Sequence, residues 1–212
     1  MSHKKQAYEN LATSIIEKFN LRGIDGYYAD SAEDALEMVQ RFFPPGCSIS
    51  WGGSETLNEI GLIDVLRDSD SDFVLYDRMA VPVEEREALY SKIVGCDYFL
   101  MSSNAITLDG QLINIDGMGN RIACLITGPK NVIIVAGMNK IVTNVEEGIN
   151  RTHNFAAPPN TVRLGKDTPC ADHGRCGNCL SEDCICCNTV ITRKSRVPGR
   201  IKVILVGEEL GF

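Results

Sequence analysis

Residues 131–137 read Asn-Val-Ile-Ile-Val-Ala-Gly, an almost unbroken apolar stretch that is closed by a glycine. A strand with one face in water alternates apolar and polar residues, whereas a strand covered on both faces reads as a continuous apolar run. Residues 201–207, Ile-Lys-Val-Ile-Leu-Val-Gly, repeat the pattern near the other end of the chain. These two stretches predict core strands of a sheet that is covered by helices on both sides.

The sequence between and before these strands alternates in type. Strands are predicted at 26–29, 47–51, 73–77 and 97–103, and helices at 6–20, 31–43, 54–60 and 82–94. Strands alternating with helices indicate the α/β class with a mostly parallel, doubly wound sheet. Residues 106–116 depart from the alternation and predict a β-hairpin insertion with an Asp109-Gly110 turn. We therefore expect one domain over residues 1–212, in which a cysteine-rich segment at 168–188 precedes the final strand.

The composition excludes several classes of function. The chain has 212 residues, 44% of them hydrophobic, and a formal net charge of −7. Nucleic acids and anionic membranes both attract basic surfaces, so neither is expected as a partner. Charged residues interrupt the apolar residues at the N-terminus, and no run approaches the roughly twenty apolar residues of a membrane span. A cytoplasmic protein is expected.

A glycine turn follows the strand predicted at 47–51. Gly52 and Gly53 separate this strand from a helix that Ser54 would cap. Glycines let a ligand approach the backbone, and the free N–H groups at a helix start attract anions. The turn therefore predicts one wall of an anion site, because ligands of open α/β sheets bind at the carboxyl ends of strands. The alternative is a tight turn in which Ser54 serves only as a cap.

A second polar block follows the strand predicted at 97–103. It contains three glycines and the candidate ligand-binding residues Asn104, Asp109, Asn114, Asp116, Asn120 and Arg121. The guanidinium of Arg121 could pair with a carboxylate or a phosphate through two hydrogen bonds. We predict that Arg121 and the glycine turn border one cleft. The alternative is a surface hairpin whose Asn and Asp side chains only make turns.

Three stretches together resemble a known family. Residues 51–61 (WGGSETLNEIG), 102–121 (SSNAITLDGQLINIDGMGNR) and 132–142 (VIIVAGMNKIV) are similar, in this order, to the LUD (lactate-utilisation) family. The resemblance implies the wider fold of ribose-5-phosphate isomerases, glucosamine-phosphate deaminases and CoA transferases. The chain lacks the acid/base signatures of the isomerases and deaminases. It also lacks a CoA-transferase glutamate in the expected setting, although Glu55 and Glu59 lie near the glycine turn.

Six of the nine cysteines lie between residues 170 and 187. In an intracellular chain such crowding points to a metal site more than to disulfides. The four favoured ligands are Cys170, Cys176, Cys179 and Cys186, with Cys184 and Cys187 as alternatives. The branch of the family that this stretch resembles also closes it with an Ile-Cys pair. The cofactor is an iron–sulfur cluster or zinc, and His173 could replace a thiolate around zinc. Free thiols are the alternative. Cys47, Cys96 and Cys124 stand alone in apolar segments and are predicted to be buried.

The resemblance implies a part in oxidising lactate to pyruvate together with iron–sulfur or flavin subunits. The cleft would hold a small anionic metabolite or a nucleotide-like ligand on Gly52, Gly53, Ser54, Glu59 and the second polar block. Whether the chain turns over a substrate alone or is a subunit of an iron–sulfur lactate oxidoreductase stays open, as does homo-oligomer formation. The alternatives are a stand-alone enzyme on a sugar phosphate or an acyl-CoA, and a binding module with a structural zinc clip.

Overall fold

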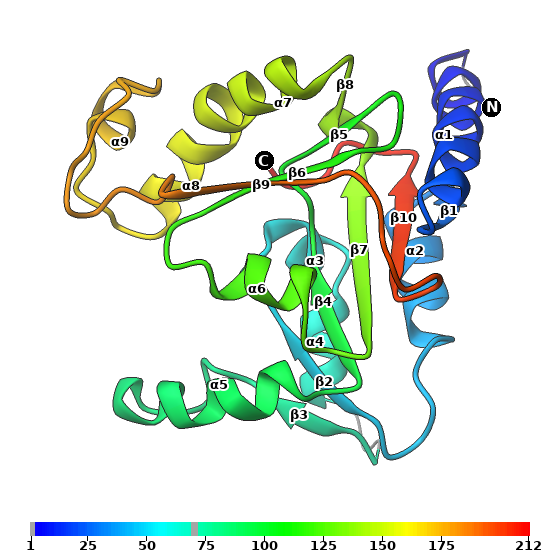
Figure 1. Ribbon diagram of the computed structural model, residues 1–212, viewed down its shortest axis with the longest axis horizontal. Coiled ribbons are helices and arrows are strands. Elements are labelled where there is room, and N and C mark those ends of the chain that lie inside the picture. Colours follow the sequence, from blue (N-terminus) through cyan, green and yellow to red (C-terminus); the bar gives the residue numbers. More distant parts are fainter. Residues whose placement is uncertain (1–2, 69–71) are drawn as a thin grey trace.

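A computed structural model of the protein describes residues 3–68 and 72–212. Within these residues, six strands form a main sheet in which every neighbouring pair is parallel (Figure 1). Their order across the sheet is β1 (Asp25–Ala29), β10 (Ile201–Val206), β7 (Asn131–Gly137), β4 (Tyr98–Met101), β2 (Ser48–Trp51) and β3 (Val74–Tyr76). The mostly parallel α/β sheet expected from the alternating sequence is confirmed.

Strand β7 is buried on both faces. Val132 and Ile134 belong to the hydrophobic cluster on one face of the sheet, whereas Ile133 and Val135 belong to the cluster on the other. Strand β10 lies between β7 and β1, with Val203 opposite Ile134. The last strand therefore completes the centre of the sheet after the cysteine-rich excursion, as its apolar sequence predicts.

Helices cover both faces of the main sheet. One cluster packs the strands against α1 (His3–Leu21), α5 (Arg86–Val94, which follows a short turn at Val83–Glu85) and α6 (Asn120–Ile126). The other cluster packs them against α2 (Ala32–Gln40), α3 (Glu55–Glu59) and α4 (Leu62–Asp68). Ser31 and Ser54 accept backbone hydrogen bonds at the starts of α2 and α3, which confirms both predicted caps.

A second sheet accounts for the hairpin that interrupts the alternation. Strands β5 (Ala105–Thr107) and β6 (Leu112–Asp116) are antiparallel, and the turn between them contains Gly110 at a φ of 83°. The hairpin is not isolated, because β8 (Ile141–Val142) pairs with β5 and β9 (Asn188–Thr192) pairs with β6. Sequence analysis did not predict β8 and β9, since one has two residues and the other is largely exposed.

A short 3-10 turn at Met138–Lys140 follows β7, and the remaining helices lie between β8 and β9 in the chain. They are α7 (Val145–Arg151), a π-helical turn at Thr152–Ala156, α8 (Ala157–Arg163) and α9 (Pro169–His173). Helix α7 lies so close to the second sheet that a Cβ on Gly148 would meet Ile113 Cδ1 at 2.2 Å. Cys47, Cys96 and Cys124 are buried, as predicted. Among the described residues, no helix is both long and apolar enough to cross a membrane.

Candidate ligand cavity and cysteine segment

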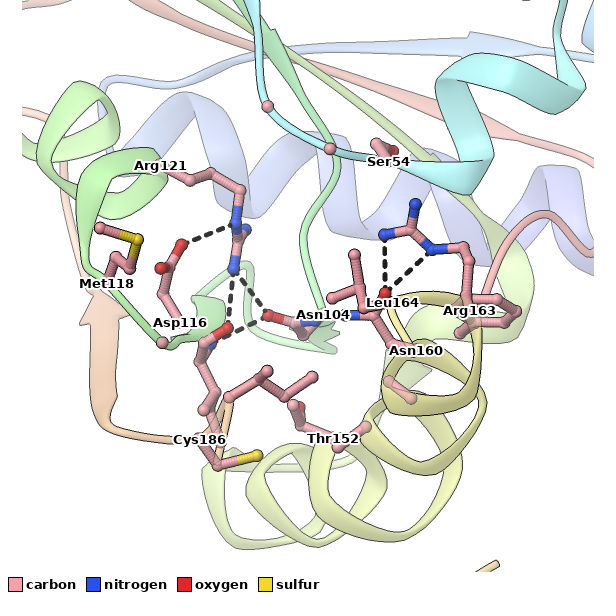
Figure 2. Close-up of a pocket in the computed structure, with 18 of the residues that line it drawn as sticks. Ser54, Asn104, Asp116, Met118, Arg121, Thr152, Asn160, Arg163, Leu164 and Cys186 are labelled. Atoms are coloured by element: carbon pink, nitrogen blue, oxygen red, sulfur yellow. Dashed lines mark hydrogen bonds and ion pairs between the residues drawn. The ribbon is translucent and has the colours of Figure 1, made fainter. Parts of the chain in front are cut away.

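A cavity of about 510 Å³ opens at the carboxyl ends of three neighbouring parallel strands. Gly52–Ser54 follows β2, Ser102–Asn104 follows β4, and Lys140 lies in the turn after β7. The opposite side comes from the α7–α8 region and from the cysteine-rich excursion at 182–187. Figure 2 shows Arg121 and Arg163 approaching from opposite sides, with Ser54 on one wall. The carboxyl edge of an open α/β sheet is where such folds bind ligands.

The glycine turn lines this cavity, but Gly52 has a different role from the one predicted. A Cβ on Gly52 would lie 3.1 Å from Arg121 Cδ, so this glycine makes room for the side chain of Arg121. A Cβ on Gly53 would lie 3.3 Å from Arg78 Nη2 and 3.8 Å from Arg163 Nη2. Helix α3 has only five residues, so its dipole is small, and the positive charge at the turn comes from the two guanidinium groups.

Arg121 is held entirely by its own chain. Its Nε donates to Asp116 Oδ2 at 3.1 Å, and the two side chains are 14% and 10% exposed. Asn104 Oδ1 accepts a further hydrogen bond from Arg121 at 3.1 Å (Figure 2). The other acceptors, at 2.6–3.2 Å, are Asn114 Oδ1 and the backbone oxygens of Ser102 and Ile115. Burial lowers the pKa of Arg121, and Asp116 opposes this shift. An arginine with five donors and five partners fixes a cavity wall and has no donor left for a ligand.

Lys140 lies in the same cavity with a different set of partners. It is 4% exposed, and its Nζ donates to Thr56 Oγ1 at 2.8 Å and to Ser102 Oγ at 3.0 Å. Within the described residues it makes no ion pair. Burial lowers its pKa to about 7, and the nearby cations Arg151 and Arg121 add to this effect, whereas Glu59 opposes it. At neutral pH a large fraction of this amine is therefore uncharged.

The charges that line the cavity are only partly balanced. Three cations make ion pairs, at 3.1 Å for Arg121 with Asp116, 3.2 Å for Arg163 with Glu55, and 3.0 Å for Lys166 with Asp183. The remaining carboxylate, Glu182, is exposed to solvent. Arg78 and Lys140 make no ion pair within the part of the chain that the structure describes. Arg78 therefore gives the cavity a positive charge without a carboxylate partner among the described residues, and Lys140 adds to this charge only when it is protonated.

Seven of the ten predicted ligand-binding residues line this cavity: Gly52, Gly53, Ser54, Asn104, Asp116, Asn120 and Arg121. The other three do not. Asp109 lies at the far turn of the β5–β6 hairpin and pairs with Arg22 at 2.7 Å. Asn114 is fully buried behind Arg121, and Glu59 accepts a hydrogen bond from Gly211 N at 2.6 Å. The polar side chains of these three residues bind other groups of the chain, so they stabilise the fold.

Four cations of the cavity were missed by sequence analysis, namely Arg78, Lys140, Arg163 and Lys166. Lys140 stands inside the third family-like stretch, next to a buried strand, and a lysine directly after such a strand was the available signal. Arg78 follows strand β3 by two residues, which is again a strand end. Arg163 gives no local signal, since it lies at the end of a helix that reaches the cavity only through the tertiary fold.

The cysteine segment gathers thiols without forming a ready metal site. Burial and the neighbouring thiols of Cys184, Cys176, Cys170 and Cys187 raise the pKa of Cys186 to about 12. Cys179 Sγ lies 3.4 Å from Ser181 Oγ, and the Cys179 thiol also interacts with Cys184, a member of this group. In residues 3–68 and 72–212, no set of three or more His, Cys, Asp or Glu side chains is arranged to hold a metal ion. The donor chemistry suits a thiophilic metal, and a shell around one would require these thiols to move closer together.

Comparison with known proteins identifies a matching family and solved structures of similar fold. The family description of the LUD domain matches residues 12–206. Among solved structures, a DUF162 family protein from Deinococcus radiodurans is similar in fold, with a TM-score of 0.54 and 15% sequence identity. The alignment covers 94% of this chain and 98% of that protein, and at this identity it shows the fold alone. No curated protein matches the sequence.

Proposed function

The chain belongs to the LUD domain family, which is associated with lactate utilisation, and we propose that its cavity binds a small carboxylate metabolite. The observation that supports the proposal most is the pair of cavity cations, Arg78 and Lys140, that have no carboxylate partner among the described residues. An anion beside the half-buried Arg78 would balance its charge, and it would favour the protonated form of the buried Lys140. A ligand carboxylate would supply the missing charge.

The position of the cations also suggests how the ligand lies. Arg78 and Arg163 flank Gly53, where the backbone is open because this residue has no side chain. Guanidinium groups bind carboxylates through parallel hydrogen bonds. The carboxylate is therefore placed at the Gly53 turn, and the rest of a small molecule points toward the hydroxyl groups around Lys140.

The wider role follows from the family. We infer that the chain takes part in oxidising lactate to pyruvate, with the two electrons and two protons passing to an iron–sulfur or flavin partner protein. In this proposal the chain supplies the binding site, and electron transfer belongs to the partner. The surplus of cations inside an otherwise acidic protein suits an anionic substrate.

Calorimetric titration tests the binding proposal. L-Lactate, pyruvate, ribose 5-phosphate and coenzyme A are titrated into the wild type, into Arg78→Gln and into a control, Arg41→Gln, whose exposed side chain pairs with Glu37 on helix α2. A carboxylate ligand should bind about tenfold more weakly to Arg78→Gln, because one charge-assisted hydrogen bond contributes roughly 1.5–3 kcal/mol. The control should match the wild type.

Other outcomes of the titration contradict the proposal. Tighter binding of ribose 5-phosphate or coenzyme A than of either carboxylate would favour the stand-alone enzyme on those substrates. Unchanged affinity in Arg78→Gln would remove the glycine turn as the carboxylate site.

We also propose that the segment 168–188 acquires an iron–sulfur cluster or zinc through Cys170, Cys176, Cys179 and Cys186. Three of these four sulfurs already lie near one another, because Cys170 and Cys176 influence the pKa of Cys186. Anaerobic purification followed by metal analysis and an absorption spectrum decides the matter, since iron–sulfur proteins are coloured and zinc proteins are not. Protein with less than stoichiometric iron and zinc would contradict this assignment.

A further inference from the structure

Lys140 has the surroundings of a nucleophilic amine. Its Nζ lines the cavity, is held by two hydroxyl groups and faces the guanidinium groups of Arg151 and Arg121. Amines that are desolvated and placed next to other cations lose their proton easily, and enzymes activate lysines for covalent chemistry in this way. The lowered pKa of about 7 agrees with this geometry.

The other lysine of the cavity lacks these features. Lys166 Nζ lies 3.0 Å from Asp183 Oδ1, and its side chain is 38% exposed. Lys166 therefore has a carboxylate partner, and Lys140 has none among the described residues. The two lysines therefore provide a matched pair inside one cavity, one suited to react and one not.

We propose that Lys140 Nζ condenses with the carbonyl carbon of a small oxo acid bound in the cavity and forms an imine. The amine attacks the carbonyl carbon, a C–N bond forms, and the carbonyl oxygen takes up a proton to give a carbinolamine. Loss of this hydroxyl as water, together with the second amine proton, leaves the C=N bond. The reaction consumes one amine and one carbonyl group, releases one water and needs no oxidant.

We expect two side chains of the cavity to contact the oxo group of this ligand and two others to contact its carboxylate. The oxo group meets Lys140 beside Thr56 Oγ1 and Ser102 Oγ, which can donate to the developing hydroxyl and accept protons in turn. The carboxylate meets Arg78 and Arg163 at Gly53. An amine reacts with an aldehyde or a ketone and guanidinium groups select a carboxylate, so the ligand class is the oxo acid. The inference rests on the proposed function, because it names the substrate class of the same cavity.

Reductive trapping tests the imine directly. The full-length protein is incubated with pyruvate and cyanoborohydride, which delivers hydride to a C=N bond, and is then examined by intact-mass and peptide mass spectrometry. We expect one adduct per chain, heavier by pyruvic acid less one oxygen atom, on the peptide that contains Lys140. L-Lactate has no ketone and should give no adduct. An adduct on Lys166 or on many lysines, or no adduct at all, would overturn the proposal.

Variants separate the imine from simple binding. Lys140→Arg keeps a cation but cannot form this imine, so the adduct should disappear, whereas Lys166→Arg should keep it in full. If Lys140→Arg fails to fold, the peptide map of the wild type decides alone. Calorimetry on the same samples distinguishes failure of the imine proposal from failure of the binding proposal. Pyruvate binding without trapping leaves the proposed function standing and rejects the imine, whereas no binding of any carboxylate rejects the proposed function.

Discussion

The cavity has two sides that are built in different ways. The sheet side consists of the glycine turn, the Arg121 network and Lys140, and its polar groups have partners within the chain. The cysteine side, residues 182–187, is partly exposed, and its thiols have only weak partners, such as the backbone oxygen of Cys184 for Cys187 at 3.3 Å. On the sheet side a ligand would therefore add an anion beside Arg78, whereas on the cysteine side a metal would add partners for the thiols.

Because of this difference, some polar residues of the cavity stabilise the fold, whereas others are available for reaction. Arg121 and Lys140 are both cations at the edge of the cavity, but Arg121 has a carboxylate partner and Lys140 has hydroxyl groups. A fully paired group contributes to the fold, whereas a buried group that lacks a counter-ion stays available for reaction. The following predictions compare these parts through the free energy of unfolding, from the largest effect to the smallest.

Replacing Arg121 should have the largest effect. Arg121→Met leaves the Asp116 carboxylate buried without its partner and removes the donors of four further hydrogen bonds. Removal of one member of a buried pair costs about 3–5 kcal/mol. Urea unfolding followed by circular dichroism measures this loss. Arg41→Gln, which breaks an exposed pair, should change stability by less than about 0.5 kcal/mol. Equal effects of the two substitutions would show that the Arg121 network does not stabilise the sheet side.

The stability contribution of Lys140 should depend on pH. The pKa of Lys140 is about 7 in the folded protein, against an ordinary value of 10.5, so between these values the unfolded chain binds more protons. Stability must then rise with pH in this window, by up to about 1.4 kcal/mol per pH unit. From about pH 7 to about pH 9, the wild type should gain about 2 kcal/mol relative to Lys140→Met.

Urea unfolding of both proteins at these two pH values, under reducing conditions, gives the comparison. The difference between wild type and variant cancels the other groups that titrate in this range. A pH dependence identical in the two proteins would mean that Lys140 stays charged in the folded state, and it would contradict a neutral, reactive amine at this position.

Substitution on the cysteine side should change stability little and metal content strongly. Cys176→Ser combined with Cys179→Ser alters two partly exposed side chains, so the metal-free reduced protein should lose less than about 1 kcal/mol. Bound metal should fall to a small fraction of the wild-type amount, because four thiolates are needed to close the shell. Elemental analysis of anaerobically prepared protein measures this. Cys124→Ala, which alters a buried cysteine far from the segment in sequence, should keep its metal, and full metal content in the double variant would exclude the proposed ligands.

Chelation should have the smallest effect on the fold. The main sheet is built from apolar residues such as Ile133 and Ile204, which do not involve the cysteine segment. Treatment with a chelator under reducing conditions should leave the far-UV circular dichroism signal of the helices unchanged, in contrast to zinc fingers, which unfold without metal. Loss of the helix signal at room temperature would place the cysteine segment within the structural core.

Local sequence patterns were enough to predict the main architecture. Continuous apolar runs at 131–137 and 201–207 predicted strands buried on both faces, because only a covered strand can omit polar residues. Ser31 and Ser54 predicted helix starts, because their hydroxyl groups satisfy backbone N–H groups that helices leave free. Glycines and polar residues at strand ends predicted the cavity edge, because the carboxyl ends of parallel strands meet there.

Only the tertiary structure decided what each of these polar residues does. Arg121 looked suited to an anionic ligand, but the fold surrounds it with five acceptors of its own chain. Lys140 looked unremarkable beside a buried strand, but the fold places its amine between Thr56 and Ser102, which are 84 and 38 residues away in sequence. Partners this distant in the chain leave no local signal, because the charge state and availability of a side chain depend on which groups the whole fold brings around it.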